Sequence, residues 1–261
     1  MKAIKLLYFL RLKKPVKLNV QSSKQISFRF FVYTLGNLKK WPWTRVGVLK
    51  DVDERLFDFK LPREDVLFDL KRPVKVEGEE LRRIHDELWK ENEEKIKILV
   101  KSLRRARRYL RYAIGIIPSI TKEKWSFDEI NYYPVIYKGG SYVRNNVFVG
   151  VDYPKKWLAS LELVLNIAVH ETIHVNVDRI TRKIGEKVRD ASREIVVIHY
   201  TSRIFKELNE EFDLSLKEQK YHLMFSSLEK YRERIEKMIG DKGYEEAVLE
   251  VDEFVRNLPK T

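Results

Sequence analysis

The most constraining feature of the sequence is the stretch LNIAVHETIHVNV, residues 165–177. It is apolar on nearly every side, yet it contains two histidines and a glutamate. A helix that is apolar all round has to lie in the protein core. Each ionisable group buried there without a partner lowers the stability of the fold by roughly several kcal/mol. The chain therefore has to fold so that this helix is enclosed and something binds its polar side chains.

His170, Glu171 and His174 spell the motif H-E-x-x-H. On a helix, residues four apart share one face, so both imidazoles reach a single ion. Glu171 lies roughly 100° around the helix from His170, close enough to contact a water on that ion. Neutral imidazoles suit Zn²⁺, and this spacing is the zincin signature. The sequence predicts one zinc ion per chain, and the alternative is a buried polar network.

Glu194 is the preferred third metal ligand. It lies on the next predicted helix among apolar neighbours, where a lone carboxylate is costly unless it meets a cation. The alternatives are that Glu194 forms a salt bridge at the helix edge, or that Asp178, Asp190 or His199 completes the site. Asp178 and Asp190 are also candidates to accept an outer hydrogen bond from a ligand.

HETIH followed by Glu194 on the next helix resembles the gluzincin metallopeptidases, and the compact layout is similar to that of the minigluzincins. The resemblance covers about residues 127–206, less than a third of the 261 residues. It implies a zincin-like core with a mixed sheet, an active-site helix and a glutamate helix. It also implies peptide-bond hydrolysis by a metal-activated water, with Glu171 as general base. The family often has an acidic residue four positions after the glutamate, where this chain has Ile198, so the support of the first histidine is unexplained.

The resemblance also implies two further elements of the site. Before the active-site helix the family has an edge strand that pairs with extended substrate, and here its place is taken by Asn146, Val147, Phe148, Val149 and Gly150. An exposed edge binds peptide by strand addition. The family usually adds a tyrosine or histidine that stabilises the transition state, and the candidates are His199, Tyr200, Tyr221 and His222. The sequence does not select one of them.

The hydrophobic pattern predicts an α+β fold. Residues 1–62, which include the run QISFRFFVYTL, are expected to form an N-terminal β-rich module. Residues 63–261 are expected to form the metallopeptidase domain, helical from about 77 to 112, with two strands in 127–153 joined by a Gly-Gly hairpin. Helices are expected from Pro154 to near Gly185 and from 187 to 207, with a C-terminal helical part over 214–257.

Charge and composition limit the classes of partner that we expect. The chain carries a net charge of +13, contains no cysteine, and has no apolar run long enough for a membrane span, so we expect a cytoplasmic protein. Peptide or protein is the expected substrate. The segment KSLRRARRYLRY, residues 101–112, gives a nucleic-acid-binding alternative because arginines with interleaved aromatics can hold phosphates and stack bases. A third possibility is an inactive zinc scaffold, or a peptidase held latent by its terminal segments.

Overall fold

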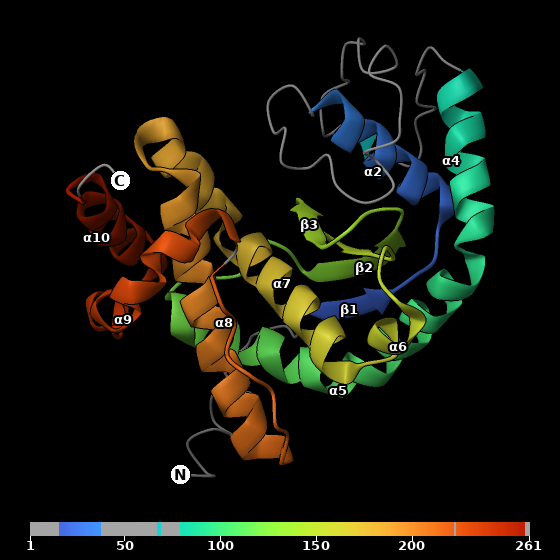
Figure 1. Cartoon of the computed structure of the whole chain (residues 1–261). Helices are drawn as coiled ribbons and strands as arrows, with labels where there is room; N and C mark the ends of the chain where they lie inside the picture. The colour runs from blue at the N-terminus through green and yellow to red at the C-terminus, as the bar shows by residue number, and fades with distance from the viewer. Residues whose placement is uncertain (1–15, 38–66, 69–78, 222, 259–261) are drawn as a thin grey trace. The chain divides into compact units, whose positions relative to one another are not determined.

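The computed structural model describes residues 16–37, 67–68, 79–221 and 223–258 (Figure 1). Over these residues the protein is α+β and mostly helical, with eight α-helices and one mixed sheet of four strands. The chain divides into two compact units that alternate along the sequence. The first comprises Met1–Leu18, Arg108–Ile130 and Val169–Thr261, and the second comprises Asn19–Arg107 and Asn131–Ala168. The predicted boundary near residue 62 lies outside the described residues.

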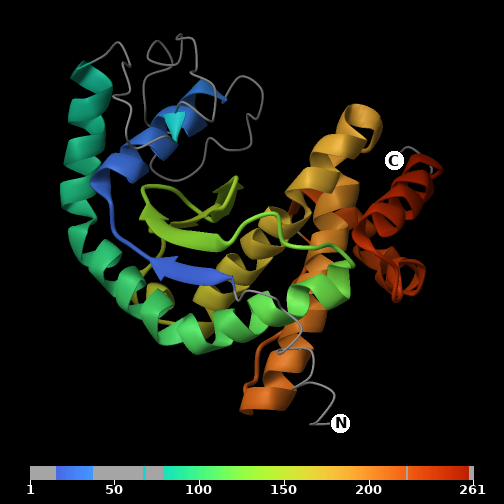
Figure 2. The same cartoon turned by 180° about the vertical axis from the view of Figure 1, so that it is seen from behind.

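The sheet has four strands, and Figure 2 shows it from behind. Their bounds are β1 Lys17–Val20, β2 Glu129–Val135, β3 Gly140–Val143 and β4 Asn146–Gly150. Their order in the sheet is β1-β2-β4-β3, with β2 parallel to β4 and β3 antiparallel to β4. The predicted strand character of residues 127–153 is thus confirmed.

The prediction that Asn146–Gly150 forms an edge strand is wrong. These residues are β4, which is paired on one side with β2 and on the other with β3. The Gly-Gly segment is not the turn of the hairpin, because Gly140 already begins β3, and the chain reverses at Arg144, whose φ is 56°. The hairpin is therefore β3–β4. Within the described residues, β1 and β3 are the end strands of the sheet.

The run QISFRFFVYTL is also not a strand, as residues Lys24–Gly36 form the helix α2. Ser23 caps it, its Oγ accepting a hydrogen bond from the backbone N–H of Ile26 at 3.2 Å. Aromatic and β-branched residues favour strands locally, but this run is buried on nearly all sides, and Phe30 stacks on Phe148 of β4 at 4.3 Å between ring centroids. Tertiary packing therefore overrides local propensity. The other strands predicted within 1–62 lie outside the described residues, apart from β1.

The predicted helices agree more closely with the structure. The helical stretch expected over 77–112 is a pair, α4 Glu79–Glu91 and α5 Glu93–Thr121. The remaining helices are α6 Lys155–Leu158, α7 Leu161–Ile184, α8 Asp190–Phe212, α9 Arg232–Ile239 and α10 Tyr244–Arg256, with a 3₁₀ helix over Leu223–Tyr231. The helix expected from Pro154 is interrupted after α6, so the motif-bearing helix starts at Leu161. No helix among the described residues is both long enough and apolar enough to cross a membrane.

In the first unit, α10 packs along α8 and holds its N-terminus (Figure 2). The side chain of Arg189, which precedes α8, makes no capping hydrogen bond. Instead, Oδ1 of Asp252 on α10 accepts hydrogen bonds from the backbone N–H of Arg189 and from Ser192 Oγ, each at 2.9 Å. Asp252 Oδ2 accepts a third bond from Arg256 at 2.6 Å. The start of α8 is thus capped by a carboxylate from a different helix.

Candidate metal centre

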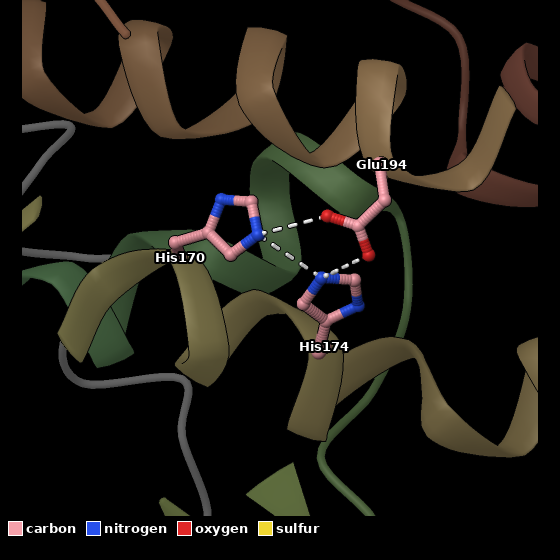
Figure 3. Close-up of side chains that lie close together, drawn as sticks. All are labelled: His170, His174 and Glu194. Atoms are coloured by element: carbon pink, nitrogen blue, oxygen red, sulfur yellow. Dashed lines mark hydrogen bonds and ion pairs between the residues drawn. The ribbon is translucent and has the colours of Figure 1, made fainter. Parts of the chain in front are cut away.

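Three side chains from two helices point toward one another in the first unit (Figure 3). His170 and His174 project from α7, and Glu194 projects from the first turns of α8. The Nε2 atoms of the two histidines are 3.2 Å apart. Glu194 Oε2 lies 3.2 Å from His170 Nε2, and Glu194 Oε1 lies 3.2 Å from His174 Nε2. The residues predicted as metal ligands are therefore brought together.

The two Nε2 atoms, and each Nε2 with one of the two Glu194 oxygens, are spaced as neighbouring ligand atoms of a small tetrahedral cation would be. Ligand atoms at about 2.0–2.1 Å from a tetrahedral zinc ion are separated from one another by about 3.3 Å. The donor set of two imidazole nitrogens and one carboxylate also suits zinc and leaves a fourth position open. Both imidazoles are buried and Glu194 is partly exposed. The residues present therefore fit a zinc ion, and the site is partly exposed at Glu194.

Glu194 is held as an anion. Burial raises the pKa of its carboxyl, but the charges and hydrogen bonds of His174 and His170 outweigh this and hold the pKa well below its ordinary value. The site thus combines one negative ligand with two imidazoles. A divalent cation would compensate that charge without further protein groups.

Glu171 lies beside the cluster but is not part of it. Its carboxylate is buried and makes no hydrogen bond to any residue that the structure describes. Burial raises the pKa of Glu171 to about 7, the charge of His170 opposes this rise, and the charge of Glu194 adds to it. A carboxyl whose pKa lies near neutrality can both accept and return a proton at physiological pH.

Gln219 is a member of the site that the sequence did not reveal. Its side-chain Oε1 lies 3.1 Å from His170 Nδ1, on the opposite side of the ring from the Nε2 atom that faces Glu194. Ile198, at the position where the gluzincin pattern often has an acidic residue, is fully buried. Gln219 lies in the coil after α8, where neither periodicity nor motif spacing distinguishes it. The contact to His170 Nδ1 thus comes from outside the two helices that carry the cluster.

Asp178 and Asp190, the other carboxylates proposed from the sequence, pair with arginines on their own helices. Asp178 accepts a hydrogen bond from Arg182 and Asp190 accepts one from Arg193, each at 2.9 Å. Among the described residues, the group able to hold a metal contains neither of them. Both positions are instead explained by ion pairs along the helix surface.

The candidate transition-state stabilisers are engaged elsewhere or lie outside the described residues. His199 Nε2 is 2.7 Å from Tyr221 Oη, and burial lowers the pKa of His199 to about 4. Tyr200 donates to the backbone oxygen of Lys242 at 2.9 Å. His222 is not among the described residues. Among the described histidines, cysteines and acidic residues, the group that could hold a metal does not include His199.

Tyr244 is a second residue that sequence reasoning missed. It is the first residue of α10, it is fully buried, and its hydroxyl lies 3.2 Å from Thr181 Oγ1. Burial raises the pKa of this phenol, the hydrogen bond with Thr181 opposes that rise, and the negative charge of Glu194 adds to it.

The aromatic rings of the basic segment 101–112 pack within the protein, Tyr109 buried and Tyr112 partly buried. Tyr109 and Tyr112 each pack edge-on against Phe212 of α8, with ring centroids 5.0 and 5.3 Å apart. Arg108 lies over the ring of Tyr109 at 4.4 Å. These rings are engaged in packing within the protein, so the base-stacking part of the nucleic-acid hypothesis loses its support.

The chain matches no protein-family model, no curated protein and no solved structure. The likeness to gluzincins therefore rests on the motif and on the site, and it stays a prediction.

Proposed function

We propose that this protein is a zinc-dependent peptidase of gluzincin type that hydrolyses peptide bonds with a metal-activated water. The observation that carries the proposal is the meeting of His170, His174 and Glu194 at 3.2 Å, beside a Glu171 carboxylate that no described residue binds. A polar network that served only the core would be expected to bond Glu171 as well.

The protein residues have distinct roles in this scheme. His170 and His174 provide neutral nitrogen ligands through Nε2, and Glu194 provides the charged oxygen ligand. When bound, zinc supplies Lewis-acid chemistry, since it lowers the pKa of a coordinated water and polarises a carbonyl oxygen. The arrangement keeps both histidines on one helix face, so a change in the pitch of α7 would disrupt the ligand set.

Glu171 acts as the proton carrier. It accepts a proton from the attacking water at its carboxylate and then donates that proton to the nitrogen of the leaving amine. Burial raises the pKa of Glu171, which favours a group that first accepts a proton and then returns it. Its position next to His170 in the chain keeps it near the centre without making it a ligand.

The test is metal content and peptide hydrolysis measured on the same purified preparations. We expect about one zinc per chain and cleavage of a mixed peptide library by the wild type. Glu171→Gln should retain zinc and lose cleavage. Glu210→Gln, an exposed glutamate on α8, is the matched control and should retain both. No zinc after reconstitution would refute the proposal, and zinc without cleavage, in full-length and terminally truncated forms alike, would identify an inert scaffold.

A further inference from the structure

We propose that Gln219 is the positioning residue that fixes the proton of His170 on Nδ1 and so aims Nε2 at the metal position. As regards function, this inference rests on the proposed zinc site. The hydrogen bond itself does not, and it can be tested in protein without metal. Gln219 lies outside the H-E-x-x-H motif and outside the glutamate helix, in the coil that leaves α8.

The direction of the hydrogen bond follows from its atoms. Gln219 Oε1 is an amide oxygen and can only accept, so His170 Nδ1, 3.1 Å away, has to donate. Both side chains are buried, so water does not compete freely for this contact. A proton held at Nδ1 frees the lone pair of Nε2 for a cation. It also keeps the imidazole plane turned toward His174 and Glu194.

The backbone of Gln219 is fixed on both sides. Its N–H donates to Ser202 Oγ on α8 at 3.2 Å, and its carbonyl oxygen accepts from Arg232 on α9 at 2.9 Å. Because both backbone groups are hydrogen-bonded, the main chain of Gln219 is held in place, and this fixes the distance from which its amide contacts His170.

The rest of the return segment, which we define as residues 213–221, is anchored in the same way. Asn209 forms a pair of hydrogen bonds with the backbone of Leu216, one to its N–H and one to its carbonyl oxygen, each at 2.9 Å. At the far end, Tyr221 bonds His199 and lies beneath the guanidinium of Arg232, 4.5 Å from the ring centroid. The return segment is thus attached to α8 at several points, with Gln219 among them.

An amide in this position has a different effect from a carboxylate. Gln219 is neutral, so it orients His170 without adding charge, and Glu194 remains the single anion of the described cluster. Replacement by glutamate keeps an acceptor of the same length and adds a negative charge. Replacement by leucine keeps the approximate volume and removes the acceptor. The two variants therefore separate orientation from packing.

The first measurement is nitrogen NMR of the histidine rings in metal-free wild type, Gln219→Leu and Gln219→Glu. We expect Nδ1 of His170 to carry a proton in the wild type and in Gln219→Glu, and to lose that preference in Gln219→Leu. An unprotonated Nδ1 in the wild type would mean that the amide nitrogen of Gln219 faces the ring, and this would overturn the proposal. Because this result decides the question in the wild type alone, a leucine variant that fails to fold does not remove the test.

The second measurement is zinc affinity by competition with a chelator. We expect Gln219→Leu to bind zinc about 10–100-fold more weakly, and Gln219→Glu to bind at least as tightly as wild type. Gln25→Leu, the same substitution at an exposed site on α2, should leave the affinity unchanged. Unchanged affinity in folded Gln219→Leu would overturn the positioning role. Absence of zinc from the wild type, together with a protonated Nδ1, would instead refute the proposed function and leave the hydrogen bond established.

Discussion

His170 Nε2 and Glu194 Oε2 lie 3.2 Å apart although the two residues belong to different helices. The carboxylate reaches both imidazoles, since its second oxygen lies 3.2 Å from His174 Nε2. Ligands from two elements make the centre dependent on the packing of α7 against α8.

Removing either kind of ligand should abolish stoichiometric metal binding. We expect His174→Ala and Glu194→Ala each to weaken zinc binding by more than the roughly 100-fold that loss of an outer partner costs. Elemental analysis after dialysis against a chelator measures this. Asp178→Asn is the control, because Asp178 pairs with Arg182 and should retain zinc. Full zinc content in Glu194→Ala would show that another residue completes the site.

The Glu171→Gln substitution should separate metal binding from catalysis. The glutamine keeps the size of the side chain but cannot accept the proton, so kcat should fall by about 10²–10⁴-fold. The zinc content should stay at the wild-type level, because Glu171 is not one of the residues grouped around the metal position. Initial rates on a fluorogenic peptide give the answer. Wild-type turnover in this variant would assign proton transfer to another residue.

The buried His199 should make the protein less stable in mild acid. Burial, with help from the charge of Arg232, lowers its pKa from 6.5 to about 4, while Glu229 opposes the shift. Between these values the unfolded chain binds the proton and the folded chain does not. The free energy of unfolding therefore falls as pH falls from about 6.5 toward 4, by up to about 1.4 kcal/mol for each pH unit.

Urea unfolding of wild type and His199→Gln at a series of pH values measures this contribution. The variant should show a shallower decline in unfolding free energy, because glutamine does not titrate in this range. The decline should not vanish, since burial also lowers the pKa of His85 to about 4. Identical pH dependence in the two proteins would mean that His199 is not buried in its neutral form.

The cap that α10 supplies to α8 should affect both stability and metal binding. We expect Asp252→Ala to lower the free energy of unfolding by about 1.5–3 kcal/mol, because buried hydrogen bonds to a charged acceptor are lost. Zinc affinity should fall as well, since Glu194 lies just after the residues that Asp252 holds. Thermal unfolding and chelator competition test the two effects. Glu253→Gln, an exposed neighbour on α10, should change neither.

The parts of the protein predicted well are those encoded by local spacing. His170 and His174 had to share a helix face, and Glu194 stood out because a carboxylate among apolar neighbours requires a cation. The structure brings these three together. The helices α4 and α5 were predicted from their apolar periodicity in the same way, although the prediction ended at residue 112 and α5 continues to Thr121.

The parts predicted wrongly depend on contacts between distant residues. Phe30 and its neighbours have strand propensity, but α2 is a helix whose rings pack on the sheet. The position of β4 inside the sheet could not be inferred from the sequence. The strand β3 lies between β2 and β4 along the chain, yet β2 and β4 are parallel neighbours in the sheet. Gln219 contacts His170 from a coil, and no sequence period relates these two residues.

The cap formed by Asp252 has a consequence for the order in which the centre is assembled. During synthesis both histidines and Glu194 leave the ribosome well before α10 does. Until α10 docks, the backbone N–H of Arg189 and the hydroxyl of Ser192 lack their acceptor, and the start of α8 is free to fray. We therefore expect a nascent chain that ends before α10 to have both imidazoles in place without a fixed carboxylate. Such a chain would release zinc readily, which would delay maturation of the centre until the C-terminal helices have folded.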